Sequence, residues 1–328
     1  MRLPCAPLAL TCGEPAGIGP ELAPLARAVL GSDVPFFWIG DPRHLPESAK
    51  IAIIDHPSEA HEVSASLLPV LRHDFPNTQI IGRPDPSNAQ SVIDVIARAV
   101  GLVTSGAASG LCTAPIHKKA LKDGAGFAFP GHTEYLAHLA GVQSVVMMLA
   151  CDALRVVPVT IHIALATVPS HLSPELIETT VRITEAALRR DFGLTRPRIA
   201  VAGLNPHAGE GGTMGREETA FINAVVARLA SEGFEIRGPL PADTMFHARA
   251  RAGYDVAICM YHDQALIPIK TLDFDGGVNV TLGLPFVRTS PDHGTAFDIA
   301  GKSLARPDSL VAALRLAHKM ARARHGDN

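Results

Sequence analysis

Three histidines lie in polar, loop-like segments spread along the chain: His162 in VTIHIAL, His207 in GLNPHAGEGG and His262 in MYHDQ. Histidine is the commonest metal ligand among side chains, because its neutral imidazole keeps a lone pair available near pH 7. Any one of the 15 histidines is more often a surface or hydrogen-bonded residue than a ligand. Three such segments, each resembling a strand end that opens into a loop, together favour a metal site.

Carboxylates close to these histidines in the sequence favour a first-row divalent metal. Glu210 shares a segment with His207, Asp263 follows His262 directly, and Asp243 lies in the short segment ADT. Two or three histidines with a carboxylate suit Zn²⁺, Co²⁺ or a similar ion better than Mg²⁺, which prefers oxygen ligands.

Other segments have the residue types that bind anions. Arg288, in the polar segment 277–302, and Lys270 upstream of it are candidates for carboxylate or phosphate contacts. The sequence GHTEY predicts a helix start that exposes donors on His132 and Thr133, although a plain helix cap explains it too. GEPAGIGPEL predicts a strand–turn–helix whose free N–H groups could face an anion, with a tight turn as the equal alternative.

Composition limits the class of protein. A chain of 328 residues suggests about two domains, and 47% hydrophobic residues supply a core. A formal net charge of −3 and only 5% aromatic residues argue against a nucleic-acid partner. No stretch reaches the roughly 18 uncharged residues of a membrane helix. Five cysteines without a CxxC pair fit a reducing compartment, so we expect a soluble, cytoplasmic protein.

Short apolar runs alternate with helical patterns, which predicts an α/β fold on a largely parallel sheet. The candidate strands are Leu8–Thr11, Phe36–Ile39, Ile51–Ile54, Gly110–Thr113, Val145–Leu149, Arg155–Thr160, Arg198–Ala202, Val256–Met260 and Val278–Leu282. The candidate helices are Glu21–Leu30, Val92–Thr104, Thr133–Ala140, Pro174–Phe192, Glu217–Glu232 and Asp308–Arg322. No Rossmann fingerprint is present, because GEGGTMG has Met214 where the third glycine belongs.

The segments GEPAGIGPEL, TAPIHKKAL, PGHTEYLA, GLNPHAGEGG, GPLPADT, MYHDQ and GVNVTLGLPFVRTSPDHGTA together resemble the 4-hydroxythreonine-4-phosphate dehydrogenase family of pyridoxal 5′-phosphate biosynthesis. The resemblance runs, with gaps, from about Leu8 to about His318, and the stretch from Asp55 to Arg83 has no motif that the family explains.

The resemblance implies the fold of isocitrate and isopropylmalate dehydrogenases: two α/β/α domains with a cleft between them, in a homodimer. We expect residues 1–128 and 268–328 to form the first domain and residues 129–267 the second, with metal ligands and dimer interface. AGIGPE is similar to a turn of that superfamily, and HGTAFDIAGK is similar to its cofactor-binding loop. That loop would bind NAD or NADP, with these candidate contacts: His293, Gly294, Thr295 and Asp298.

The resemblance also implies a role for each candidate site residue. His162, His207 and His262 would bind a divalent metal (Zn, Co or Mg) in a site shared by both subunits, with Asp243 next to it. The residues implied to hold the phosphorylated substrate are His132, Thr133, Lys270, Asn279 and Arg288. The general base stays open among Lys270, Asp243 and a metal-bound hydroxide.

The implied reaction is the NAD(P)-dependent oxidation of 4-phosphooxy-L-threonine at C3, followed by decarboxylation to 3-amino-2-oxopropyl phosphate. The nearest alternative is a dehydrogenase of a phosphorylated four-carbon sugar acid, D-threonate or D-erythronate 4-phosphate. A metal-dependent hydrolase or an acyltransferase is more distant, because neither gives HGTAFDIAGK a task and the chain has no HExxH motif.

Overall fold

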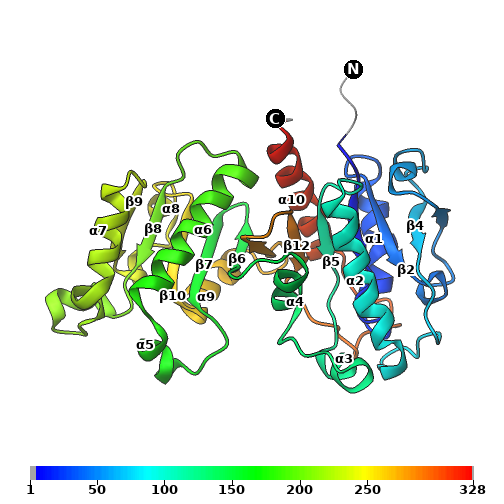
Figure 1. Ribbon diagram of the computed structural model, residues 1–328, viewed down its shortest axis with the longest axis horizontal. Coiled ribbons are helices and arrows are strands. Elements are labelled where there is room, and N and C mark those ends of the chain that lie inside the picture. The colour runs from blue at the N-terminus through cyan, green and yellow to red at the C-terminus, as the bar shows by residue number, and fades with distance from the viewer. Residues whose placement is uncertain (1–4, 327–328) are drawn as a thin grey trace. The chain divides into compact units, whose positions relative to one another are not determined.

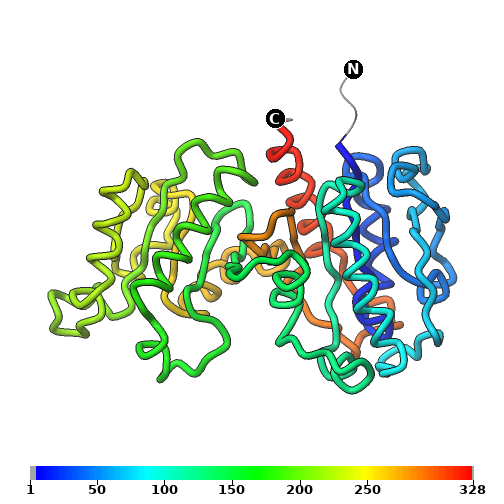
Figure 2. The backbone as a smooth tube through the Cα atoms, viewed as in Figure 1, coloured from blue at the N-terminus to red at the C-terminus, as the bar shows by residue number. Residues whose placement is uncertain are grey.

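The computed structural model describes residues 5–326, and the chain forms two compact units (Figure 1). Unit 1 comprises residues 1–145 and 284–328, and unit 2 comprises residues 146–283. Unit 1 is therefore built from both ends of the sequence. Figure 2 shows the N-terminal part, in blue and cyan, and the C-terminal part, in red, within the same unit.

Unit 1 contains a parallel sheet with the strand order β3-β4-β2-β1-β5-β12. Its strands are β1 (Leu8–Thr11), β2 (Phe36–Gly40), β3 (Ile51–Ile54), β4 (Leu68–Arg72), β5 (Leu111–Thr113) and β12 (Arg288–Pro291). Its helices are α1 (Gly19–Leu30), α2 (Ala89–Thr104), α3 (Lys118–Ala125), α4 (His132–Leu139) and α10 (Asp308–His325). Phe36, Phe37 and Trp38 are fully buried, as expected for a strand inside a parallel sheet that is covered on both faces.

Unit 2 contains a mixed sheet with the order β11-β6-β7-β10-β8-β9, in which β6 pairs antiparallel with β7 and β11. Its strands are β6 (Val146–Cys151), β7 (Leu154–Thr160), β8 (Ile199–Ala202), β9 (Ile236–Leu240), β10 (Val256–Tyr261) and β11 (Val278–Leu282). Its helices are α5 (Val168–His171), α6 (Pro174–Phe192), α7 (Asn223–Ser231), α8 (Ala248–Arg251) and α9 (His262–Leu272). Helix α9 packs against β7 and β10, and α6 packs against β7 (Figure 1).

Short helical turns connect these elements. They are η1 (Pro42–His44), η2 (Pro57–His61), η3 (Pro86–Asn88), η4 (Leu165–Thr167), η5 (Pro206–Gly212), η6 (Glu218–Ile222, a π-helical turn) and η7 (Ala242–Thr244). None of the helices within residues 5–326 is both long enough and apolar enough to span a bilayer.

Helix α6 shows how local sequence sets an element's limits. The Ser173 hydroxyl accepts a hydrogen bond from Leu176 N at 3.1 Å, and Pro174 occupies the first helical position, where its missing N–H costs nothing. Gly193 ends the helix in the left-handed conformation that favours glycine. The structure confirms the predicted limits of this helix.

The boundaries between the two units, 145/146 and 283/284, fall later in the sequence than the expected domain limits, 128/129 and 267/268. Helix α4 packs against α2, so it belongs to unit 1. Helix α9 and strand β11 pack within unit 2, which therefore extends to Gly283. As a result, His132 and Thr133 lie in unit 1, whereas Lys270 and Asn279 lie in unit 2.

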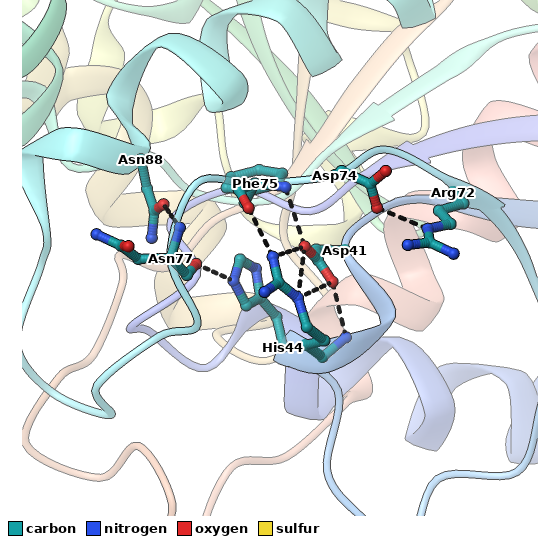
Figure 3. Close-up of polar contacts among 8 residues, drawn as sticks. Asp41, His44, Arg72, Asp74, Phe75, Asn77 and Asn88 are labelled. Carbon is teal, nitrogen blue, oxygen red and sulfur yellow. Dashed lines mark hydrogen bonds and ion pairs between the residues drawn. The ribbon is translucent and has the colours of Figure 1, made fainter.

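A buried carboxylate fixes the segment that no family motif explains (Figure 3). Asp41, 1% exposed, accepts hydrogen bonds from Phe75 N at 2.9 Å and from the Arg43 guanidinium. Burial alone would raise the pKa of Asp41, but these bonds outweigh it and hold the pKa at about 2. His44 Nε2 lies 3.0 Å from Asn77 O, so a second contact ties the same loop to η1. The segment is thus anchored by its own polar network.

Candidate functional site

Two of the predicted metal ligands lie side by side in unit 2. Strands β7 and β10 are parallel neighbours, with Thr160 opposite Tyr261. His162 lies just beyond Thr160, and His262 follows Tyr261 directly, so both histidines leave the carboxyl ends of adjacent strands. Their ring centroids are 5.6 Å apart. Ligands of α/β sheets bind at this edge.

The second imidazole nitrogen of His262 has a carboxylate partner. His262 Nδ1 lies 2.7 Å from Asp263 Oδ1. Because a carboxylate accepts the proton on Nδ1, the Nε2 lone pair is left for a ligand, which is the arrangement common behind metal-bound histidines. The chemistry of His162 and His262 therefore fits a divalent metal.

The third predicted ligand, His207, lies in the η5 turn after β8, the other neighbour of β10. His207, Ala208 and Glu210 have positive φ angles of 52°, 52° and 41°. Non-glycine residues adopt this conformation at a cost, and such strain concentrates at functional sites. Within residues 5–326, no three His, Cys, Asp or Glu side chains are grouped closely enough to hold a metal. The structure thus brings together His162 and His262 but does not group His207 with them.

Buried polar side chains that sequence reasoning did not single out hold this edge of the sheet in place. Glu218, 1% exposed, accepts hydrogen bonds from Asn205 N at 2.8 Å and from Asn205 Nδ2 at 2.9 Å. Gln264 accepts from Met260 N at 2.7 Å and donates to Gly203 O at 2.8 Å. Both residues position the loops that carry the histidines. The only sequence signal for Glu218 is that two consecutive glutamates, Glu217 and Glu218, come just before an apolar helix.

The remaining unit 2 candidates lie around the same helix and loops. Asp243 is exposed in η7, which contacts η5. Lys270 lies two turns after His262 on α9, and both line one shallow depression along that helix. Asn279 is partly buried in β11, opposite Leu149. The structure therefore places Lys270 on the same helix face as a predicted metal ligand.

The unit 1 candidates form a separate, positively charged group. Arg288 is 3% exposed, and its Nη2 donates to Thr113 Oγ1 at 2.7 Å. Burial lowers the pKa of Arg288 to about 10, which leaves it charged at neutral pH. His132 Nε2 is buried without a hydrogen-bond partner. Burial, followed by the charges of Arg288 and Lys118, keeps the pKa of His132 well below its ordinary value.

This group fits an anion. His132 and Thr133 are the first two residues of α4. No side chain caps the N-terminus of this helix, and the first N–H groups of a helix have no partner within it. A neutral imidazole whose Nε2 has no hydrogen-bond partner, a buried guanidinium and a helix N-terminus without a side-chain cap together match a phosphate or carboxylate. The structure places His132, Thr133 and Arg288 in one unit.

The turn AGIGPE and the predicted cofactor loop HGTAFDIAGK contact each other in unit 1. Ile18 N donates to Thr295 O at 3.1 Å, and Glu21 accepts a hydrogen bond from Gly301 N. A Cβ on Gly17 would lie 2.7 Å from Thr295 O, so only glycine allows this approach. AGIGPE and HGTAFDIAGK, nearly 280 residues apart, therefore form one structural feature.

A cavity of about 710 Å³ opens beside these interlocked segments, within the volume range of ligand pockets. Gly17, Glu21, Gly301 and Ser303 contribute to its lining. The other predicted cofactor residues lie in the HGTAFDIAGK loop. His293 Nδ1 lies 2.9 Å from Gly294 O, and the Asp298 side chain is exposed.

Glu14, in the loop between β1 and α1, gives the stability of the protein a pH dependence. Burial, the largest cause, raises the pKa of Glu14 from 4.5 to about 7, although Ala16 N donates to its carboxylate. The folded protein keeps a proton there that the unfolded chain releases, so the free energy of unfolding falls as pH rises from about 4.5 to about 7.

We expect Glu14→Gln to remove this contribution, so that the variant loses less stability than the unmodified protein over the same pH range. Urea unfolding at several pH values measures the difference. An unchanged pH dependence in the variant would show that Glu14 does not hold the proton.

Comparison with known proteins supplies independent information. The family model of the pyridoxal phosphate biosynthetic protein PdxA matches residues 33–317. A 4-hydroxythreonine-4-phosphate dehydrogenase from Paracoccus denitrificans is 65% identical over 319 residues, covering 96% of this chain and 98% of that protein. The crystal structure of a 4-hydroxythreonine-4-phosphate dehydrogenase from Klebsiella pneumoniae is 38% identical, with a TM-score of 0.87, covering 96% of this chain and 99% of that one.

A β-decarboxylating dehydrogenase from Thermococcus kodakarensis, 16% identical with a TM-score of 0.50, covers 98% of this chain and 84% of that one, and shares the fold. The predicted isocitrate/isopropylmalate dehydrogenase-like fold class is confirmed. The match to the family model and the 65% identity across nearly the whole of both sequences leave one assignment: the chain belongs to the PdxA family of pyridoxal phosphate biosynthetic proteins.

Proposed function

We propose that the protein oxidises 4-phosphooxy-L-threonine at C3 with NAD or NADP and that the resulting β-keto acid loses CO₂ to give 3-amino-2-oxopropyl phosphate. The observation that carries this proposal is the 65% identity, over nearly full length, to a protein named 4-hydroxythreonine-4-phosphate dehydrogenase. The geometry supports it, because the structure contains a histidine pair, a cationic group and interlocked cofactor-type loops.

His162, His207 and His262 are the proposed ligands of a divalent metal, Zn, Co or Mg. Such an ion, when bound, lowers the pKa of a coordinated hydroxyl and polarises a carbonyl. His207 lies in the η5 turn after β8, which is a neighbour of β10, and this position supports it as the third ligand. Asp263 holds His262 in the tautomer that this role requires.

Five residues are the proposed contacts of the substrate. Arg288, His132 and Thr133 bind its phosphate, and this remote anchor fixes the reacting carbon. Lys270 and Asn279 complete the binding site. Lys270 or Asp243 is the proposed base for the proton of the C3 hydroxyl, and a bound nicotinamide would accept the hydride. Lys270 lines the same depression as His262, which favours Lys270 over Asp243 as this base.

NAD or NADP is the proposed hydride acceptor, bound by the loop that contains His293, Gly294, Thr295 and Asp298. The contact between Ile18 N and Thr295 O supports this placement, because it joins the two superfamily-like segments. The adjacent cavity offers room for part of the dinucleotide.

A homodimer with a shared active site is the proposed assembly, in the cytoplasm. Exposed apolar side chains in the segments that follow His162 and His262 support it: Leu165 is 67% exposed, Ile267 64% and Phe274 74%. Contiguous exposed apolar surface marks interaction sites. No disulfide joins the cysteines of residues 5–326, which agrees with a reducing compartment.

Replacing Leu165 and Ile267 with serine is expected to weaken the dimer and reduce activity in parallel, because both changes remove apolar surface that a partner would cover. Light scattering and activity measured over a range of protein concentrations test this. Ile53→Ser, at an exposed position of β3 in unit 1, is the matched control. A native chain that is monomeric and fully active would refute the shared site.

The test of substrate choice is a side-by-side assay of NADH formation with 4-phosphooxy-L-threonine and with D-threonate and D-erythronate 4-phosphates. We expect the amino acid phosphate to have the highest kcat/KM. Preference for a sugar acid phosphate would leave the reaction class intact and change the substrate.

A further inference from the structure

One lysine beside the proposed phosphate site has no role in the function described so far. Lys118 is the first residue of α3, and its side chain is exposed. A Cβ placed on Gly131 would lie 3.4 Å from Lys118 Cε and 3.5 Å from Lys118 Nζ. The ammonium group therefore lies against the residue that precedes His132 at the start of α4.

The surroundings of this ammonium group are those of an anion site. His132 Nε2 is buried without a hydrogen-bond partner, and Arg288 is 3% exposed. The charges of Lys118 and Arg288 both act on the His132 ring, adding to burial, the largest cause of its lowered pKa. Two cations around one neutral imidazole favour a ligand with more than one negative charge.

We propose that Lys118 binds the phosphate group of the substrate together with His132 and Arg288. The proposal rests on the function given above for these two residues and adds a second, solvent-accessible cation beside Arg288. Lys118 reaches this position from α3, whereas Arg288 reaches it from β12, so the phosphate is contacted from two elements of unit 1. The flexible ammonium group of Lys118 would contact the phosphate from its exposed side, and the planar guanidinium of Arg288 would contact it from the protein interior.

A nearby carboxylate, Glu134, offers another explanation for the position of Lys118. Glu134 Oε2 would be 3.4 Å from the same Cβ on Gly131, so Lys118 could serve only to balance its charge. The neighbouring Lys119 shows what such pairing looks like here: it forms an ion pair with Asp123 one turn along α3. In the described part of the chain, no ion pair joins Lys118 to Glu134. Charge balance and phosphate binding make different predictions for a Glu134 variant.

The experiment compares Lys118→Met with Lys118→Arg and with Lys119→Met as the matched control. Calorimetry with inorganic phosphate measures anion binding without catalysis, and steady-state kinetics gives KM for the phosphorylated substrate and for NAD⁺. Because a hydrogen bond to a charged group contributes about 1.5–3 kcal/mol, we expect Lys118→Met to weaken phosphate binding and raise the substrate KM by about 10- to 100-fold. Lys118→Arg should retain most of the affinity. Lys119→Met should change neither, and no variant should change the KM for NAD⁺.

Three results would overturn the proposal. They are absent phosphate binding to the unmodified protein, unchanged phosphate affinity in Lys118→Met, and recovery of that affinity when Glu134→Gln is added to Lys118→Met, since recovery would mean charge balance. Circular dichroism and Tm show whether each variant folds, and Lys118→Arg keeps the test valid if Lys118→Met does not. If the chain binds phosphate but oxidises none of the three substrates, the proposed function fails while the assignment of Lys118 stands.

Discussion

Replacing His262 with alanine is expected to lower kcat/KM by more than about 100-fold, because even the groups behind metal ligands contribute 10- to 100-fold to affinity or activity. The same holds for His162, whose ring lies 5.6 Å from that of His262. Each change should leave Tm nearly unaffected. These side chains are at least partly exposed, so their removal opens no cavity in an apolar core.

Steady-state kinetics together with elemental analysis of the purified variants measures this effect. His61→Ala, at an exposed position of η2 in unit 1, is the control for loss of an arbitrary histidine. His207→Ala should behave like the other two variants if the η5 turn delivers His207 to the metal. Stoichiometric metal in the His262→Ala or His207→Ala protein would count against the ligand assignment.

Replacing Arg288 with lysine is expected to raise the KM for the phosphorylated substrate by about 10- to 100-fold, the range of one charge-assisted hydrogen bond. Lysine keeps the charge but loses the planar fork that can contact Thr113 and an anion at the same time. We also expect a lower kcat, since the remote phosphate helps to align the reacting carbon.

NAD⁺ affinity should change little in this variant, because the cofactor is assigned to the loop around Thr295. Kinetics with each substrate varied in turn separates the two effects. A weakened cofactor with an unchanged phosphorylated substrate would mean that the two binding assignments must be exchanged. Thr113→Val tests the buried partner and should give a smaller effect in the same direction, since it removes one contact of the guanidinium.

Most strands could be predicted because they are short apolar runs between turn signals. Leu8–Thr11, Ile51–Ile54 and Val278–Leu282 were predicted with the limits that the structure shows. The three strands that sequence reasoning missed contain proline or polar residues. Strand β4 includes Pro69, β9 includes Gly238-Pro239, and β12 has the sequence RTSP. Their strand pairing depends on the neighbours that a sheet supplies, which a local pattern does not contain.

The candidate site residues could be chosen from the sequence where the residue type alone indicates a chemical role, as for the histidines. His162 and His262 come together because β7 and β10 are adjacent, and strand order is a property of the whole fold. His262 was expected at a strand end opening into a loop, but it begins α9; Pro268 inside that helix hides the helical pattern. Glu218 was not singled out because its role depends on burial and on a hydrogen bond from Asn205, 13 residues away. No local sequence pattern indicates either of these.

The most direct test of the account is absorbance of NADH when the purified protein is mixed with 4-phosphooxy-L-threonine and NAD⁺, with and without a chelator. We expect NADH to form together with an equal amount of CO₂, to stop forming when the chelator removes the metal, and to resume when Zn²⁺ or Co²⁺ is returned. NADH formation at full rate in protein shown by elemental analysis to be free of metal would contradict the account. So would a complete lack of NADH with either NAD⁺ or NADP⁺ in the metal-loaded protein.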